Sequence, residues 1–160
     1  MDSRDPAPTF RTQSATPDAT TTAPKPKKKV SKKKQKQSEQ KFIDGYHHAH
    51  DLIYQNKDYA AGFAALRALH HDENVDVANL LGYSSRKLGN YDDAKYWYEK
   101  ALVADPKHTR TWQYYGMWQI EQGNRLKAEE YLAKIETICG TQCEDYKTLK
   151  FALVNGGGNY

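Results

Sequence analysis

Cysteine is the residue type in this chain best suited to covalent chemistry, and its two cysteines lie four positions apart at Cys139 and Cys143. That separation allows the short distance between Cα atoms that a disulfide needs, and a bridge across so small a loop would stabilise the fold by about 2 kcal/mol. The spacing differs from the C-x-x-C of thiol oxidoreductases, and a tetrahedral zinc site would need two further ligands that the neighbouring residues do not supply. A disulfide is therefore expected, with two reduced, half-buried thiols as the alternative.

The cysteine pair and the start of the chain indicate different compartments. A disulfide is typical of oxidising, extracytoplasmic compartments such as the periplasm. The residues after Met1 include no apolar stretch of the kind found in a signal peptide, and the chain has no run of about 18 apolar residues. These absences predict no transmembrane segment and favour a soluble, cytoplasmic protein by default, unless a leader has been lost.

Histidines are the other candidate ligands, but their pattern is typical of a helix surface. His47 and Asp51 stand four residues apart and could share a proton or a metal ion on one helix face. Such pairs are common on ordinary helices. The sequence also shows no Ser/His/Asp order, no phosphate-binding loop and no paired-carboxylate motif above chance. We expect no metal site, no cofactor and no enzymatic activity.

The elements that position these residues repeat along the chain, because residues 75–106 and 109–140 superimpose at a shift of 34 positions. The matched small residues are Gly82 with Gly116, Gly89 with Gly123, and Ala94 with Ala128. Glycine inside a helix costs about 1 kcal/mol relative to alanine, so a matched helical glycine needs a packing reason. We expect Gly82 to face Ala94, and Gly116 to face Ala128, where the two helices of each hairpin meet.

This repeat resembles the tetratricopeptide repeat (TPR) family, whose unit is a helix, a turn and a second helix of the same period. The Gly-Asn dipeptides after residues 88 and 122 fit the turn, and Pro106 fits the end of the second helix. The segment around Trp112 and the cysteine pair are also similar to small bacterial TPR proteins. The residues expected to pack the repeats together are Tyr46, Gly62, Leu81, Gly82, Ala94, Tyr98, Trp112, Gly116, Ala128 and Leu132.

The resemblance implies an all-α fold, a right-handed stack of about three helix-turn-helix repeats. A poorer first copy precedes the other two, with residues 56–59 in place of the Gly-Asn-Tyr turn. Residues 144–154 have the pattern of one further amphipathic helix, which would cap the stack. We expect a disordered arm over residues 1–41, the helical domain over 42–155, and a flexible glycine-rich tail over 156–160.

Charge divides the chain at the same boundary. Residues 1–41 hold eleven Lys and Arg against four Asp and Glu, a net charge of +7, whereas residues 42–160 hold thirteen against sixteen, a net charge of −3. Nine of the basic residues lie between Lys25 and Lys41. Such a run can neutralise phosphates but carries no sequence information, and no aromatic residue interleaves with it to stack on bases. It fits a linker, an arm that docks on its own domain, a nonspecific contact or a targeting signal.

The resemblance also implies a site, because TPR proteins bind partners in a concave groove formed by the first helix of each repeat. The corresponding residues are Asp76, Asn79, Tyr83, Arg86, Arg110, Gln113, Met117 and Ile120, with His47, Asp51 and Tyr54 from the first repeat. Arg86 and Arg110, expected to be exposed, would pair with an acidic group of a peptide. Alternatively, Tyr83 and Ile120 simply pack between repeats. Chaperone-tail recognition is disfavoured, since the lysines and asparagines of the TPR clamp are missing.

The expected function is therefore a scaffold that binds a peptide or helix of a protein partner in the concave groove. The alternative is a protein that associates with a polyanion or a membrane surface through Lys25 to Lys41. The sequence identifies neither the partner nor the oligomeric state.

Overall fold

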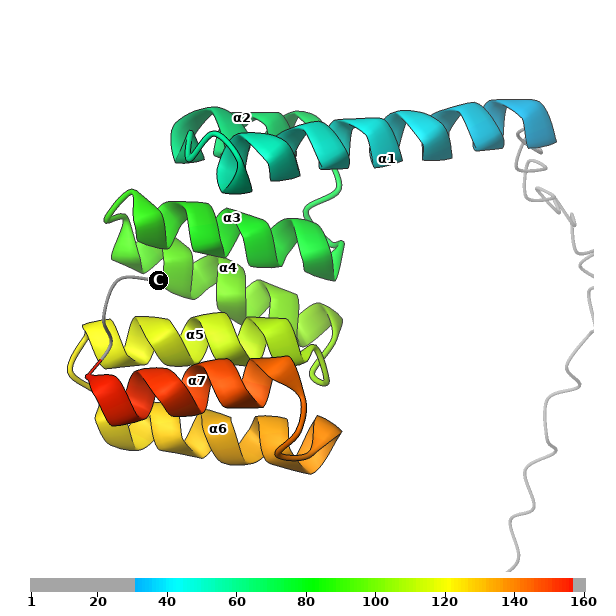
Figure 1. The fold of residues 1–160 in the computed structure, drawn as a ribbon. Coiled ribbons are helices and arrows are strands. Elements are labelled where there is room, and N and C mark those ends of the chain that lie inside the picture. Colours follow the sequence, from blue (N-terminus) through cyan, green and yellow to red (C-terminus); the bar gives the residue numbers. More distant parts are fainter. Residues whose placement is uncertain (1–30, 157–160) are drawn as a thin grey trace, which may run out of the picture. The chain divides into compact units, whose positions relative to one another are not determined.

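The structure is a computed structural model that describes residues 31–156, and all regular structure in that range is helical. The helices are α1 (Lys32–Tyr54), α2 (Tyr59–Ala68), α3 (Val75–Lys87), α4 (Tyr91–Ala104), α5 (Thr109–Glu121), α6 (Arg125–Cys139) and α7 (Glu144–Asn155). Hairpins α1/α2, α3/α4 and α5/α6 stack on one another, and α7 packs against α5 and α6 (Figure 1). This architecture confirms the predicted all-α, TPR-like stack. Among the described helices, none has the length and apolar character needed to cross a membrane.

Each hairpin turns at a residue in the left-handed backbone conformation. Gly89 and Gly123 follow α3 and α5 with φ of 78° and 77°, as expected for glycines that end a helix. The first hairpin has Lys57 at the equivalent place, two residues before the helix-starting tyrosine, with φ of 57°. Asp58 then caps α2 by accepting a hydrogen bond from the backbone N–H of Ala61 at 3.0 Å. The first hairpin thus makes the same turn without a glycine, so its sequence matches the repeat pattern less well than those of the other two.

The helical glycines make close contacts, but not with the predicted partners. A methyl group placed on Gly82 would lie 2.6 Å from Cδ1 of Tyr98 in α4, and one placed on Gly116 would lie 2.6 Å from Cδ2 of Leu149 in α7. Ala94 and Ala128 are fully buried but are not the residues that fill these spaces. The nearest neighbours of the glycines are therefore not the expected alanines, because a tyrosine ring and a leucine of the capping helix occupy the space that the glycines leave open.

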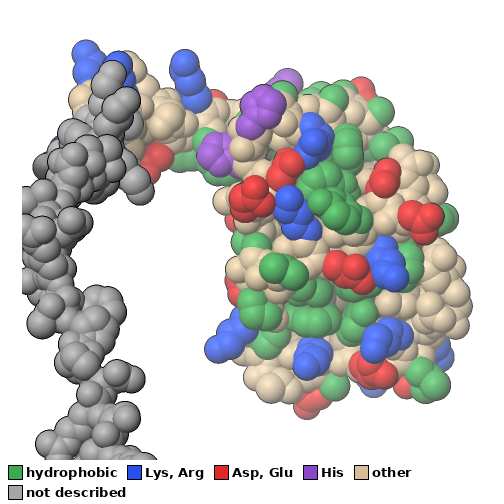
Figure 2. Space-filling model, turned by 180° about the vertical axis from the view of Figure 1, so that it is seen from behind, with side chains coloured by type: hydrophobic (Ala, Val, Ile, Leu, Met, Phe, Trp, Pro, Cys, Tyr) green, Lys and Arg blue, Asp and Glu red, His purple; other side chains and the backbone are tan. Residues whose placement is uncertain are grey.

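The other residues expected in repeat packing follow the seam between helices, with two departures. Leu81, Tyr98 and Leu132 are buried in the core, as is Gly62. Tyr46 is only half-buried, and so is Trp112, whose indole Nε1 donates to the carbonyl of Pro106 at 2.8 Å. Trp112 lines a shallow apolar depression with Leu102, Val103 and Tyr131. Figure 2, which shows the face opposite to that of Figure 1, shows hydrophobic side chains gathered among charged ones.

Helix α1 begins at Lys32, ten residues before the expected domain boundary. The assignment of residues 32–41 to a disordered arm is therefore wrong. Lysine, glutamine and glutamate are good helix formers, and residues 32–41 contain no glycine or proline, so an established helix extends at little cost. This exposed, lysine-rich part of α1 projects beyond the end of α2 (Figure 1). The predictions for residues 1–30, and for the tail beyond Gly156, concern residues outside the described range.

Cys139 and Cys143 form a disulfide that links the end of α6 to the residue before α7. The bridge confirms the predicted pairing. Because Cys143 immediately precedes α7, the bridge ties the start of this helix to the stack. Helix α7 therefore occupies a covalently restrained position, and its first turn forms part of the candidate site.

Candidate peptide-binding groove

Aromatic side chains on α1 form one wall of a cavity between the first two repeats. Tyr46, His50 and Tyr54 are spaced four residues apart, so they share one face of the helix. The cavity measures about 520 Å³. It is lined by these three residues, by Asp76, Asn79 and Leu80 of α3, and by His108 and Arg110 at the start of α5. We call it the first cavity.

A second cavity of about 270 Å³ adjoins the first, since Arg110 lines both. Its other lining residues are Tyr83 and Arg86 of α3, Gln113, Tyr114 and Met117 of α5, and Glu144, Asp145 and Thr148 of α7. The capping helix thus supplies a wall of the site in addition to closing the stack. We call the two cavities together the groove.

Three stacked tyrosines stand where the two cavities meet. The ring of Tyr83 lies 5.4 Å from that of Tyr54 and 4.8 Å from that of Tyr114, measured between centroids. The hydroxyls of Tyr54 and Tyr114 share a hydrogen bond of 2.5 Å, which joins α1 to α5. Burial raises the pKa of Tyr46 and of Tyr83 to about 12, and raises that of Tyr54 further. Tyr46, Tyr54 and Tyr83 are therefore neutral and able to donate or accept hydrogen bonds at physiological pH.

The raised pKa values predict a cooperative loss of structure in alkali. Burial also raises the pKa of Tyr98 and Tyr115, whereas an unfolded tyrosine titrates near pH 10, at about its reference pKa. Since the folded pKa exceeds the unfolded one, this contribution to stability is complete below about pH 10 and is lost as pH rises toward about 12. Tyrosinate absorbance and circular dichroism should therefore change together once the pH exceeds about 10, the reference pKa of tyrosine. Gradual ionisation of every tyrosine near its reference pKa, with the helices intact, would contradict the burial of this cluster.

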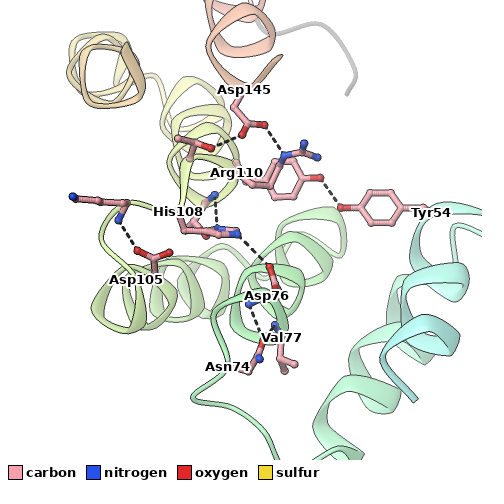
Figure 3. Close-up of polar contacts among 12 residues, drawn as sticks. Tyr54, Asn74, Asp76, Val77, Asp105, His108, Arg110 and Asp145 are labelled. Atoms are coloured by element: carbon pink, nitrogen blue, oxygen red, sulfur yellow. Dashed lines mark hydrogen bonds and ion pairs between the residues drawn. The ribbon is translucent and has the colours of Figure 1, made fainter. Parts of the chain in front are cut away.

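Polar contacts at the start of α5 fix two side chains of the groove (Figure 3). His108 precedes the helix, and its Nδ1 accepts the backbone N–H of Thr111 at 3.3 Å while Nε2 lies 3.2 Å from Oδ1 of Asp76. The hydrogen bond from His108 lowers the pKa of Asp76. Arg110 donates through Nε to Asp145 at 2.6 Å, and Thr109 donates to the same carboxylate at 2.7 Å. Helices α3, α5 and α7 are thus joined by ion pairs along the groove.

Arg86 departs from its expected exposure. Its side chain is 2% exposed, and its Nη1 donates to the carbonyl of Tyr114 at 3.0 Å. Its Nε lies 3.8 Å from Glu121 and has no hydrogen-bond partner among the described residues. The guanidinium also lies 5.4 Å and 5.9 Å from the centroids of the Tyr83 and Tyr114 rings. Arg86 therefore joins α3 to α5, and the half-exposed Arg110 is the arginine that a ligand can reach.

Asn79 is the least satisfied polar residue of the groove. It is 3% exposed and lines the first cavity, yet its Oδ1 accepts no hydrogen bond from any described residue. An unsatisfied buried acceptor costs about 1 to 3 kcal/mol. This cost arises inside the protein, because the oxygen is shielded from the cavity.

The structure places most of the residues expected in the groove along it. Asp76, Asn79, Tyr83, Arg86, Arg110, Gln113 and Met117 line the two cavities, as does Tyr54. Ile120 lines neither. Tyr83 also packs between repeats, as the alternative held, since it is 7% exposed between two rings.

Two of the three residues predicted from the first repeat are wrong by one position, whereas Tyr54 lines the first cavity as predicted. His47 and Asp51 are exposed outside both cavities, and α1 presents Tyr46 and His50 in their place. The regular spacing of aromatic residues on α1 is a signal that could have identified this face. Sequence reasoning also missed Leu80, His108 and Tyr114, and the three residues of α7, for which a helix treated only as a cap offered no signal.

Comparison with known proteins supports the fold. Residues 75–108 match the sequence model of the tetratricopeptide repeat, so α3 and α4 form a TPR unit. Two structures of the type III secretion translocator chaperone SycD from Yersinia enterocolitica are similar to the chain. The first, an alternative dimer, has a TM-score of 0.61 at 21% identity, covering 72% of this chain and 88% of SycD. The second, a complex with a peptide of the translocator YopD, has a TM-score of 0.59 at 20% identity, covering 81% and 93%. No curated protein sequence matches the chain.

Proposed function

We propose that the chain is a peptide-binding scaffold whose groove holds a segment of a protein partner. The observation that carries this proposal is the continuity of the two cavities through Arg110, which gives a path across the first helices of all three repeats and α7. SycD, which shares the fold, binds a peptide of YopD, and this supports a ligand of the same kind here. The proposed role is binding rather than catalysis.

The lining of the groove suits a polypeptide. Rigid tyrosine rings provide contact area at a low entropic cost, and their hydroxyls can bond peptide carbonyls and N–H groups. Asn79 and Gln113 add amide groups beside those rings. Arg110 is half exposed, and although Asp145 and Tyr114 engage part of its guanidinium, its exposed N–H groups can reach a ligand carboxylate or carbonyl.

Peptides selected by display on the intact chain provide the test. For a selected peptide, Arg110→Ala should weaken binding by about 1 to 3 kcal/mol, because a charge-assisted hydrogen bond is lost. It should change the free energy of unfolding by at most about 1 kcal/mol, because the guanidinium is half exposed. Lys134→Ala, which removes the same charge from α6 outside the groove, is the matched control and should leave the affinity unchanged. Equal affinities for both variants would contradict binding in the groove.

The lysine-rich segment provides the competing explanation. Lys32, Lys33, Lys34, Lys36 and Lys41 all lie on the exposed part of α1, where they could contact a polyanion or an anionic membrane surface. Replacing them with glutamine should flatten the salt dependence of binding without abolishing it. If this variant loses all binding while Arg110→Ala retains it, the lysine-rich segment is the binding site and the groove is not.

A further inference from the structure

We propose that the first cavity binds a cationic side chain, a lysine or an arginine, of the segment held in the groove. This inference rests on the proposed function and deepens it, because it assigns a chemical class to one residue of the ligand. It stands on hydrogen-bond acceptors, aromatic faces and charge balance.

The α3 wall of the cavity presents the carboxylate of Asp76. The Asp76 side chain is 56% exposed, and His108 contacts only its Oδ1, so Oδ2 has no hydrogen-bond partner among the described residues. Asn79 lies one helical turn further along the same wall, but its Oδ1 is shielded from the cavity, so Asp76 is the acceptor that a ligand can reach. An ammonium carries three donors and a guanidinium five, which suits a wall of this kind.

The opposite wall is aromatic. The ring of His50 lies 4.6 Å from that of Tyr54 and 6.5 Å from that of Tyr46, so three rings of α1 follow one another along the cavity. A cation placed over such faces is attracted by the ring quadrupoles, and this attraction strengthens when the site excludes water. The stem of a lysine or arginine side chain would contact the same rings.

The charges around the cavity permit a cation. Arg110 is the basic residue of the lining that is always charged, and the carboxylate of Asp145, 2.6 Å from its Nε, compensates it. Asp76 contacts His108 at 3.2 Å, and no lysine or arginine among the described residues pairs with its carboxylate, which is 56% exposed. Asp76 therefore presents a carboxylate to the cavity that a cation of the ligand can pair with.

The test uses three small probes with the intact, isotope-labelled chain: the amides of N-acetyl-arginine, N-acetyl-citrulline and N-acetyl-glutamate. Citrulline has the shape of arginine without its charge, so it isolates the contribution of the cation. The arginine probe should shift the amide resonances of Asp76, Asn79 and Tyr46 saturably. It should bind about fivefold or more tightly than the citrulline probe, the factor expected for one cation–π contact of moderate strength.

Variants then locate the effect. Asp76→Asn should remove the preference for arginine over citrulline, whereas Asp44→Asn, on the exposed opposite side of α1, should keep it. Tyr46→Leu retains the apolar volume and removes a ring, and it should reduce the preference, so it provides a second reading if Asp76→Asn alters the fold. Equal affinity for arginine and citrulline, tighter binding of glutamate, or the same loss in Asp44→Asn would overturn the inference.

The outcomes for this inference differ from those for the proposed function. A displayed peptide that binds the groove while the arginine probe does not would overturn the cation site and leave peptide binding standing. Saturable binding of the arginine probe without any groove-binding peptide would support the cation site and overturn the peptide-binding role.

Discussion

Leucine in place of Gly82 is expected to lower the free energy of unfolding by about 3 kcal/mol or more, at or beyond the upper end of typical overpacking. Even the first carbon of the new side chain would lie 2.6 Å from the ring of Tyr98, which is fully buried and cannot swing aside into solvent. The two helices of the TPR unit, α3 and α4, must then separate. Urea denaturation followed by circular dichroism measures the change.

Two further variants separate crowding from other effects at this position. Gly82→Ala gains helix propensity of about 1 kcal/mol, so a net loss of stability would show that contact with Tyr98 outweighs it. Ala60→Leu adds the same apolar bulk to an exposed position of α2 and should be nearly neutral. Denaturation curves of Gly82→Leu and wild type that coincide would refute the close packing of α3 on α4.

The repeat period and the turns could be predicted from the sequence because they depend on local chemistry. Gly89 and Gly123 adopt positive φ, for which glycine has no steric penalty, so a Gly-Asn dipeptide specifies the turn at both places. The start of α1 could not be located this way. Lysine-rich segments that extend a helix and those that remain disordered have similar compositions, and what differs is attachment to a packed helix.

The contacts of the site were harder to predict because they depend on how repeats stack. Matching the groove positions of TPR proteins to this sequence identified Asp76, Asn79 and Arg110, where the repeat is regular. It identified Tyr54 in the first repeat but gave His47 and Asp51 in place of Tyr46 and His50. An error of one position matters because it rotates a side chain about 100° around the helix. The groove residues of α7 were not predicted because this helix lies outside the repeat. The burial of Arg86 was not predicted because it depends on Tyr114, which is 28 residues away in sequence.

Replacement of Arg86 by alanine is expected to destabilise the domain by about 2 to 3 kcal/mol, contrary to the small effect that exposure would predict. The change removes the hydrogen bond to the Tyr114 carbonyl and the ion pair with Glu121, and it leaves a space between α3 and α5. The carbonyl would then be buried without this donor, and Tyr83 and Tyr114 would lose the cation beside their rings. Thermal and urea melts of the purified variant measure the loss.

Arg86→Met and Arg110→Ala distinguish the charge of Arg86 from its volume. Methionine refills most of the space without restoring the hydrogen bond, so it should recover part of the loss, and the remainder reports the polar contacts. Arg110 has the same side chain on the same groove but is half exposed, so its loss should cost at most about 1 kcal/mol. If both arginine-to-alanine variants melt like the wild type, Arg86 does not join α3 to α5. If only Arg86→Ala lowers the free energy of unfolding strongly, the two arginines have different roles. Arg86 then stabilises the packing of α3 on α5, and Arg110 is available to contact the ligand.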